Sequence, residues 1–318
     1  MGIGDKIDSL LVRCAGRMLR ARGMFSSYFG RWRWHFTKLE NMGLHVLPVH
    51  CYTPIPDSRT LPPSLWEKPS ELVGLKLDTA KALTVLAEIG AFRDEYAAFP
   101  VNSSSDPTQY YYANGAYGPG DAEVLYGMIR RLKPNRIIEI GSGNTTLIIS
   151  SAILKNRAEG YLCDFTAIEP YPKTMLRGKI AGLTQLVEKP LQEVPLEAFA
   201  QLGENDILFI DSTHIARIGS DVCYELLEIV PRLAKGVYVH VHDIYLPAQY
   251  PKRFIVEARF FWNEQYLLHA FLAFNDSFEV VWPGQLMHLR HSDELAEAFP
   301  AYAQERPAHG NFWMKRVK

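Results

Sequence analysis

Two acids and two histidines stand at the ends of two β-rich runs in this 318-residue chain. Asp211 ends the run DILFID and is followed by His214, while His242 and Asp243 end the run GVYVHVHD. If both runs are adjacent parallel strands, the four side chains meet at the carboxyl edge of the sheet, where open α/β sheets bind ligands. A histidine beside a carboxylate can serve as a general base. The same set could instead hold a divalent metal, and its two imidazoles favour zinc or manganese over a harder ion.

His214 and His242 are therefore the candidate bases, with Asp211 or Asp243 to orient them, and all four residues are candidate metal ligands. His240 shares a strand face with His242, because side chains two apart point to the same side. Only His242 stands at the end of the run. We expect His240 to lie in the core.

A second candidate site is the glycine-rich turn after the run RIIEI, which ends in Glu139 and Ile140. The turn, GSGNTT at 141–146, leads into a helical stretch, a geometry that cradles a nucleotide-like ligand at a helix N-terminus. Glycines there let the backbone approach a ligand without an intervening Cβ. Thr146 replaces the third glycine of a dinucleotide fingerprint, and the turn lacks the Gly-Lys-Ser/Thr of a P-loop. A nucleophile elbow would need glycine where Ile140 stands.

The elements that must position these residues alternate between strands and helices from about Tyr110 onward. Such alternation indicates an α/β fold with a doubly wound, mostly parallel sheet that is covered by helices on both faces. The expected strands are RIIEI, DFTAIE, QLVEK, DILFID and GVYVHVHD, with FEVVW and NFWMKRV as a C-terminal antiparallel hairpin, which makes a seven-stranded sheet. The expected helices cover about 120–132, 145–155, 172–182, 220–233 and 253–274.

Three motifs together resemble the class I S-adenosylmethionine-dependent methyltransferases over roughly Tyr110 to Lys318. They are EIGSGNTT, AIEP with Glu169 at the end of the second strand, and DILFIDSTH. The terminal strand pair is similar to the reversed hairpin of that Rossmann-like fold. The text from IDSTH to GVYVHVHDI is similar to a bacterial small-molecule and sugar O-methyltransferase-like branch. Ser212 and Thr213 depart from the usual Gly of that branch, and Lys235-Gly236 replaces Gly-Gly.

The resemblance implies a transferase that moves a methyl group from S-adenosylmethionine to a sugar or another small hydroxylated molecule. Glu169 would accept hydrogen bonds from both ribose hydroxyls, and Glu139 and Asp211 would attract the cationic end of the cofactor. Metal-dependent catechol-type relatives bind magnesium at this edge of the sheet, but they carry an Asn ligand where this chain has Ile244. The implied cofactor-binding residues are Glu139, Gly141, Ser142, Gly143, Thr145, Glu169 and Asp211.

We expect residues 1–109 to form an N-terminal helical and proline-rich extension that caps the acceptor site, and 110–318 to form the cofactor-binding domain. The first 36 residues carry seven Lys and Arg against two Asp, with apolar residues between them. This pattern predicts a packed amphipathic helix, with docking to an anionic membrane surface or a partner as the alternative. In the proline-rich segment, the residues expected at the acceptor pocket are His45, His50 and Tyr52. Further polar contacts are expected from Arg253, Glu257, Arg259, Asn263 and Glu264.

Composition excludes several classes of protein. Lys and Arg number 34 against 35 Asp and Glu, so no global field favours nucleic acid. Four scattered cysteines without a Cys-x-x-Cys pair argue against a disulfide framework and a structural zinc site. No apolar run reaches the roughly 18 residues that a bilayer span needs, and no secretory signal is visible. We expect a cytoplasmic enzyme with a small-molecule acceptor, no nucleic-acid partner and no integral membrane association, and homo-oligomer formation stays open.

Three other functions stay open at this point. An NAD-dependent Rossmann oxidoreductase is disfavoured by Thr146 and by the lack of a suitable Tyr-x-x-x-Lys pair. A metal-dependent hydrolase would use the four strand-end residues. A non-catalytic binding or scaffold protein would depend on the basic N-terminal segment.

Overall fold

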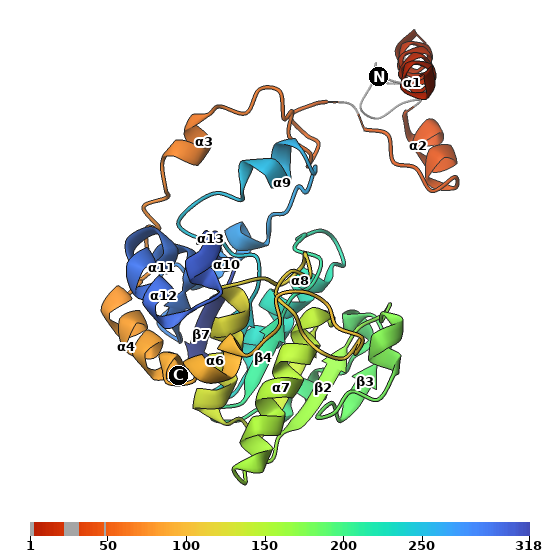
Figure 1. Ribbon diagram of the computed structural model, residues 1–318. Helices are drawn as coiled ribbons and strands as arrows, with labels where there is room; N and C mark the ends of the chain where they lie inside the picture. Colours follow the sequence, from red (N-terminus) through yellow and green to blue (C-terminus); the bar gives the residue numbers. More distant parts are fainter. Residues whose placement is uncertain (1–2, 22–31, 48) are drawn as a thin grey trace. The chain divides into compact units, whose positions relative to one another are not determined.

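The computed structural model describes residues 3–21, 32–47 and 49–318, and the chain divides into two compact units, Met1–Pro62 and Pro63–Lys318 (Figure 1). The first unit holds α1 (Ile3–Ala21) and α2 (Trp32–Glu40), followed by turns through the proline-rich segment. Leu10, Leu11 and Met18 of α1 are exposed. Packing of α1 on the protein and docking to a membrane surface both stay predictions. Within the described ranges, no helix has the length and apolar character needed to cross a bilayer.

The second unit starts well before the predicted domain boundary at residue 110. It includes α3 (Ser64–Glu67), α4 (Thr79–Gly90) and α5 (Arg93–Ala97). Asp78 caps α4 by accepting hydrogen bonds from two backbone N–H groups of its first turn, as the sequence indicates. The proposed role of residues 1–109 as a cap over an acceptor stays a prediction.

A seven-stranded sheet forms the centre of the second unit, in the order β3-β2-β1-β4-β5-β7-β6. The first five strands are parallel, and β7 runs antiparallel between β5 and β6. This confirms the doubly wound, mostly parallel α/β fold with a C-terminal antiparallel pair. The strands are β1 (Arg136–Ile140), β2 (Asp164–Ile168), β3 (Gln185–Val187), β4 (Ile207–Ile210), β5 (Tyr238–Val241), β6 (Phe278–Pro283) and β7 (Phe312–Arg316).

Apolar side chains alternate between two cores, one on each face of the sheet. Ile137 of β1 and Phe209 of β4 belong to one core, while Ile138 and Leu208 belong to the other, as the two-residue period of a strand requires. The first core packs against α4, α6 (Asp121–Leu132) and α7 (Asn144–Ala158), which lie side by side on the sheet (Figure 1). The second packs against α8 (Asp221–Tyr224), the segment that follows it, and α10 (Glu264–Leu272). Strands buried on both faces explain the near-continuous apolar runs in the sequence.

Two of the expected helices differ from the structure. The stretch 172–182 contains only a short 3₁₀ turn, Thr174–Arg177. The stretch 253–274 is two helices, α9 (Lys252–Val256) and α10, with Arg259 between them in a left-handed conformation (φ 62°). A residue with positive φ ends a right-handed helix, so one continuous helix was wrong.

The remaining helical regions follow the prediction more closely. The stretch expected at 220–233 begins as α8, continues as a π-helical turn (Glu225–Ile229) and ends as a 3₁₀ turn (Val230–Arg232). The connection between β6 and β7 is filled by α11 (Gly284–Arg290), α12 (Ser292–Ala298) and α13 (Tyr302–Glu305). This long connection is why β6 and β7 pair without a tight hairpin turn.

Candidate functional site

The glycine-rich turn joins β1 to α7, and its two glycines, Gly141 and Gly143, have different surroundings. Gly141 has φ +77°, and a Cβ built there would lie 1.9 Å from the carbonyl oxygen of Asp211, just beyond β4. Glycine is therefore required at 141 because the neighbouring strand end is too close for any side chain. Gly143 is in extended backbone (φ 178°), and a Cβ there would meet nothing within 4 Å. Gly143 thus faces open space at the carboxyl edge of the sheet.

Glu139 lies beneath this turn and holds the start of α7. It is fully buried, and its two carboxylate oxygens accept hydrogen bonds from the hydroxyls of Thr145 (2.5 Å) and Thr146 (2.7 Å). Burial raises the pKa of Glu139 to about 8, although the two hydroxyls oppose this rise. Thr146 Oγ1 also accepts a hydrogen bond from the Gly143 N–H (3.1 Å). With a pKa of about 8 this carboxyl group is mostly neutral at pH 7, so the attraction between Glu139 and a cation stays a prediction.

Glu169 follows β2 and lies on the open side of the same turn. Its Oε2 accepts from the Ser142 N–H (3.3 Å), and its Oε1 accepts from the Tyr171 N–H (2.8 Å). The Ser142 hydroxyl is buried and has no hydrogen-bond partner among the described residues. A cavity of about 160 Å³ opens here, which we call the Gly-loop cavity. Its walls are Ala116, Tyr117, Gly141, Ser142, Gly143, Asn144, Thr145, Glu169, Lys173 and Asp211.

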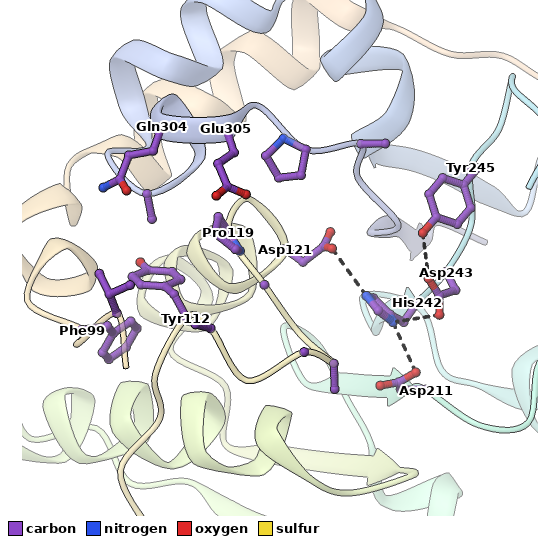
Figure 2. Close-up of a pocket in the computed structure, with 18 of the residues that line it drawn as sticks. Phe99, Tyr112, Pro119, Asp121, Asp211, His242, Asp243, Tyr245, Gln304 and Glu305 are labelled. Atoms are coloured by element: carbon purple, nitrogen blue, oxygen red, sulfur yellow. Dashed lines mark hydrogen bonds and ion pairs between the residues drawn. The ribbon is translucent and has the colours of Figure 1, made fainter. Parts of the chain in front are cut away.

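The strand-end cluster consists of Asp211, His214, His242 and Asp243, which the structure brings together as predicted. The register of β4 and β5 pairs Ile210 with Val241, so Asp211 and His242 leave the sheet side by side. His214 Nε2 lies 3.4 Å from Asp211 Oδ1 and 3.5 Å from Asp243 Oδ2. His242 Nδ1 lies 3.3 Å and 3.7 Å from the same two oxygens. Figure 2 shows His242 between the two aspartates.

Two further carboxylates face the outer nitrogens of the histidines. Glu264 is fully buried, and its Oε2 lies 2.9 Å from His214 Nδ1. Asp121, the first residue of α6, has its Oδ2 3.6 Å from His242 Nε2 (Figure 2). The sequence did not single out Asp121, and it suggested Glu264 only as an acceptor contact. Neither pairing has a local signature, since the partners are 50 and 121 residues apart.

The charges in the cluster support one another. Burial lowers the pKa of His214, but Asp211 and Glu264 outweigh it and raise that pKa to about 10. Burial likewise opposes the charge on His242, yet Asp211, Asp243 and Asp121 raise its pKa well above the ordinary value. In turn, burial raises the pKa of Asp211, but the two histidines hold it well below its usual range. The cluster on its own is a set of ion pairs, and each imidazole must give up a proton before it can act as a base or a metal ligand.

A larger cavity of about 940 Å³ adjoins the strand-end cluster, and we call it the aromatic cavity. Asp211, His242 and Asp243 form its floor, and Ala116 and Asp211 line both this cavity and the Gly-loop cavity. His214 lies behind the floor. The aromatic side chains on its walls are Phe99, Tyr112, Tyr245, Phe254, Phe260 and Trp262, and its charged rim includes Arg253 and Glu305.

The residues predicted to contact the acceptor lie at different places in the structure. Arg253 lines the aromatic cavity. Asn263 instead caps a loop, since its side-chain oxygen accepts from the Ala216 N–H (2.6 Å). His45, His50 and Tyr52 lie in the first unit, so their place at the acceptor site stays a prediction, as do the contacts of Glu257 and Arg259. His240 is fully buried, stacks on Phe209 and lies tilted against Trp313, which confirms its expected place in the core.

Comparison with known proteins identifies one domain. Residues 138–244, from β1 to the end of the strand-end cluster, match the family described as "Methyltransferase domain". A protein of Archaeoglobus fulgidus that is described as uncharacterized is 32% identical over 170 residues, which cover 50% of this chain and 75% of that protein.

Solved structures are more distant. Two of them are described as "CmcI-N160 apo-structure" and "cmcI-D160 Mg-SAM"; each is 16% identical over 71% of this chain and 84% of the other, with TM-scores of 0.37 and 0.34. A third, a putative protein-L-isoaspartate O-methyltransferase from Plasmodium falciparum in complex with S-adenosyl-L-homocysteine, is 14% identical over 52% of this chain and 77% of the other, with a TM-score of 0.26. At these TM-scores the likenesses carry no argument about the site of this chain.

Proposed function

Because the chain belongs to the class I S-adenosylmethionine-dependent methyltransferases, we propose that it methylates a hydroxyl oxygen of a sugar or another small hydroxylated molecule. One observation carries this proposal. Asp211 lines both the Gly-loop cavity and the aromatic cavity, and the strand-end cluster lies where the two meet. Groups that can accept a proton thus stand between the cavity beside the glycine-rich turn and a larger pocket.

The Gly-loop cavity fits the cofactor in chemistry. The carboxylate of Glu169 can accept from vicinal ribose hydroxyls, and the unpartnered hydroxyl of Ser142 is a buried group that calls for a ligand partner. The open space at Gly143 admits a ligand against the backbone. Thr145 joins the cavity wall to Glu139. We therefore assign cofactor binding to Glu139, Gly141, Ser142, Gly143, Thr145, Glu169 and Asp211.

When bound, the cofactor supplies a methyl group on a positively charged sulfur. The acceptor oxygen forms a bond to the methyl carbon as the carbon–sulfur bond breaks, and its proton passes to the strand-end cluster. Asp243 lines the aromatic cavity and can receive that proton, His242 can do so only after giving up its own, and His214 orients Asp211 and Asp243 from behind. Positioning of the two reactants next to each other supplies much of the rate. We propose His214, His242 and Asp243 as the residues of the chemical step.

The walls of the aromatic cavity support the proposed acceptor class. Phe260 and Trp262 stack with ring centroids 4.9 Å apart and an interplanar angle of 13°, which presents a broad apolar surface. Such a surface suits the apolar face of a sugar ring or another small cyclic molecule. Gln304 and Glu305 also line the aromatic cavity (Figure 2) and can form hydrogen bonds with hydroxyls. The balanced net charge of −1 argues against nucleic acid as the acceptor, and the scattered cysteines without a Cys-x-x-Cys pair support a cytoplasmic enzyme.

Calorimetry with S-adenosylhomocysteine and with NAD tests the cofactor. We expect one S-adenosylhomocysteine per chain and no binding of NAD. Binding of NAD without S-adenosylhomocysteine would replace the proposal with an oxidoreductase.

Transfer of a labelled methyl group to a panel of sugars and other hydroxylated compounds then tests the reaction. Asp243→Asn should lower kcat by about 10²- to 10⁴-fold and leave S-adenosylhomocysteine affinity unchanged. Asp276→Asn, which removes a surface partner of Lys318, is the matched control. Equal activity of Asp243→Asn and the control would remove the strand-end cluster from the chemistry.

A further inference from the structure

Arg253 places a positive charge on the wall of the aromatic cavity. It is the second residue of α9, it is exposed, and it lines the cavity. Within residues 3–21, 32–47 and 49–318, its side chain forms no ion pair. Other arginines of the second unit do pair with acids, namely Arg130, Arg131, Arg136, Arg177, Arg232 and Arg306. An arginine without an acid partner at a cavity wall is available to an anion that enters the cavity.

The side chain of Arg253 lies against a group of aromatic rings. Its guanidinium carbon is 5.2 Å from the centroid of the Phe254 ring, which is within reach of cation–π attraction. Phe254 in turn meets Phe260 and Trp262 edge-on, with ring centroids 5.9 and 5.3 Å apart. All four residues line the aromatic cavity. A guanidinium over a ring keeps the N–H groups in its own plane available, and these match the paired oxygens of a carboxylate or phosphate.

The acids on the floor of the same cavity are engaged by other partners. Asp211 and Asp243 form ion pairs with His214 and His242, so the strand-end cluster carries little net charge and makes no use of Arg253. The cofactor proposed for the Gly-loop cavity carries a positive charge on its sulfur. An acceptor with a negative charge is therefore attracted both by the wall and by the cofactor.

Glu305 is the rival charge on the cavity wall. It belongs to α13, lies beside Gln304 (Figure 2), and has no ion pair with any residue that the structure describes. It would suit an acceptor with an ammonium group. Two arguments favour Arg253 instead. Arg253 adjoins the rings that a cyclic acceptor would contact, and the positive sulfur of the cofactor would repel a cationic acceptor.

We propose that the methyl acceptor is a hydroxylated ring compound with a carboxylate or phosphate group, and that Arg253 binds this group. The ring of the acceptor lies against Phe254, Phe260 and Trp262, and its hydroxyl reaches Asp243 on the cavity floor. This inference rests on the proposed function, because it names the acceptor class of the same site. Arg253 determines specificity, since it holds the acceptor and takes no part in the methyl transfer itself.

Binding of matched compounds to the full-length protein, saturated with S-adenosylhomocysteine, tests for the anion site. The members of each pair differ at one anionic group: 4-hydroxybenzoate and 4-hydroxybenzyl alcohol, glucuronate and glucose, and glucose 6-phosphate and glucose. The last two pairs distinguish a carboxylate from a phosphate. Calorimetry measures each Kd, and we expect the anion of at least one pair to bind at least about 10-fold more tightly than its neutral partner.

Variants test whether Arg253 causes this preference. Arg253→Gln should weaken binding of the preferred anion by at least about 10-fold and leave the Kd values of the neutral compound and S-adenosylhomocysteine unchanged. Arg253→Lys keeps the charge but loses the fork of donors, so its Kd should be intermediate. Lys252→Gln is the matched control, because Lys252 lies over the Trp66 ring (5.6 Å) and does not line the cavity. In methyl-transfer assays, Arg253→Gln should raise the KM of the anionic acceptor and leave kcat unchanged.

Three results would overturn the proposal. The first is that no anion binds more tightly than its neutral partner, complete absence of binding included. The second is a preference for the anion that persists in Arg253→Gln. The third is tighter binding of glucosamine than of glucose that is lost in Glu305→Gln, which would assign a cationic acceptor.

The same experiments keep this inference separate from the proposed function. Transfer of a labelled methyl group to neutral compounds alone would support methylation and refute the anion site. Binding of an anion that depends on Arg253, without transfer to any compound, would support the anion site and refute methylation.

Discussion

Substitutions at the two glycines of the glycine-rich turn, Gly141 and Gly143, should have different effects. Together they test where the cofactor lies. At Gly143 the backbone is extended and open, so a side chain fits the fold and intrudes only on a ligand. Valine adds three carbons. If each displaces a ligand contact worth about 0.8 kcal/mol, binding weakens by about 2.4 kcal/mol, or roughly 60-fold in Kd. Alanine adds one carbon and should cost about fourfold.

At Gly141 the same change should act on folding. A Cβ there would lie 1.9 Å from the Asp211 carbonyl oxygen at φ +77°. The left-handed backbone costs about 1–2 kcal/mol and the forced shift of a packed strand end about 1–3 kcal/mol. Gly141→Ala should therefore lower the free energy of unfolding by about 2–5 kcal/mol.

Calorimetry with S-adenosylhomocysteine and thermal unfolding on the same samples check both glycines. Gly203→Ala is the control, because its Cβ would make only an ordinary 3.8 Å contact with Asp206. Undiminished S-adenosylhomocysteine affinity in Gly143→Val would show that the Gly-loop cavity is not the cofactor site. A Gly141→Ala protein as stable as the unaltered one would refute the close-approach argument.

Three further predictions follow from the same structure. Glu169→Ala should weaken S-adenosylhomocysteine binding by roughly ten- to a hundred-fold in calorimetry with little change in Tm, and an effect on Tm alone would contradict the ribose role. A truncated protein of residues 63–318 should keep the Tm of the full chain within about 3 °C, because both hydrophobic cores lie between Leu72 and Met314. A higher KM for the acceptor in the truncated protein would support the predicted cap. Loss of folding would refute the independence of the second unit. The pKa of Glu139 is raised from 4.5 to about 8 in the folded protein. The folded state therefore binds a proton that the unfolded state loses above pH 4.5. This adds roughly 3–5 kcal/mol to the free energy of unfolding below pH 4.5, and the contribution is lost as the pH rises to 8. Denaturant unfolding of Glu139→Gln should lack this slope, and identical pH slopes for variant and unaltered protein would contradict it.

The parts of the fold that the sequence predicts well are those with a strong local period. RIIEI and DILFID are apolar runs that must be buried on both faces, and β1 and β4 occupy them. The predicted helix at 172–182 does not form, because Pro172 precedes and Gly178 follows a short 3₁₀ turn, Thr174–Arg177. The stretch 253–274 has a helical pattern at both ends, yet Arg259 in the left-handed region divides it, and no local signal marks that residue.

At the candidate site, the sequence predicts the residues that each strand end contributes. It does not predict the residues that other elements contribute. Asp211 and His242 could be placed together because parallel strands end at one edge. Asp121 could not, since it opens a helix that precedes the sheet and reaches His242 only through the tertiary fold. The requirement for glycine at 141 was predicted from ligand approach, whereas the structure shows that the Asp211 carbonyl sets it. The sequence contains the residue types, and packing decides which atom each one meets.

The position of Asp211 links the two halves of the proposed reaction. Its backbone forces Gly141 to be glycine and so shapes the glycine-rich turn, while its carboxylate pairs with His214 and with His242, of which His242 lines the aromatic cavity. Tyr117 strengthens this link, because it lines the Gly-loop cavity and its ring lies 4.6 Å from that of His242. In the proposed reaction, the adjacent ends of β4 and β5 would set donor and acceptor relative to each other, as in-line transfer of a methyl group requires.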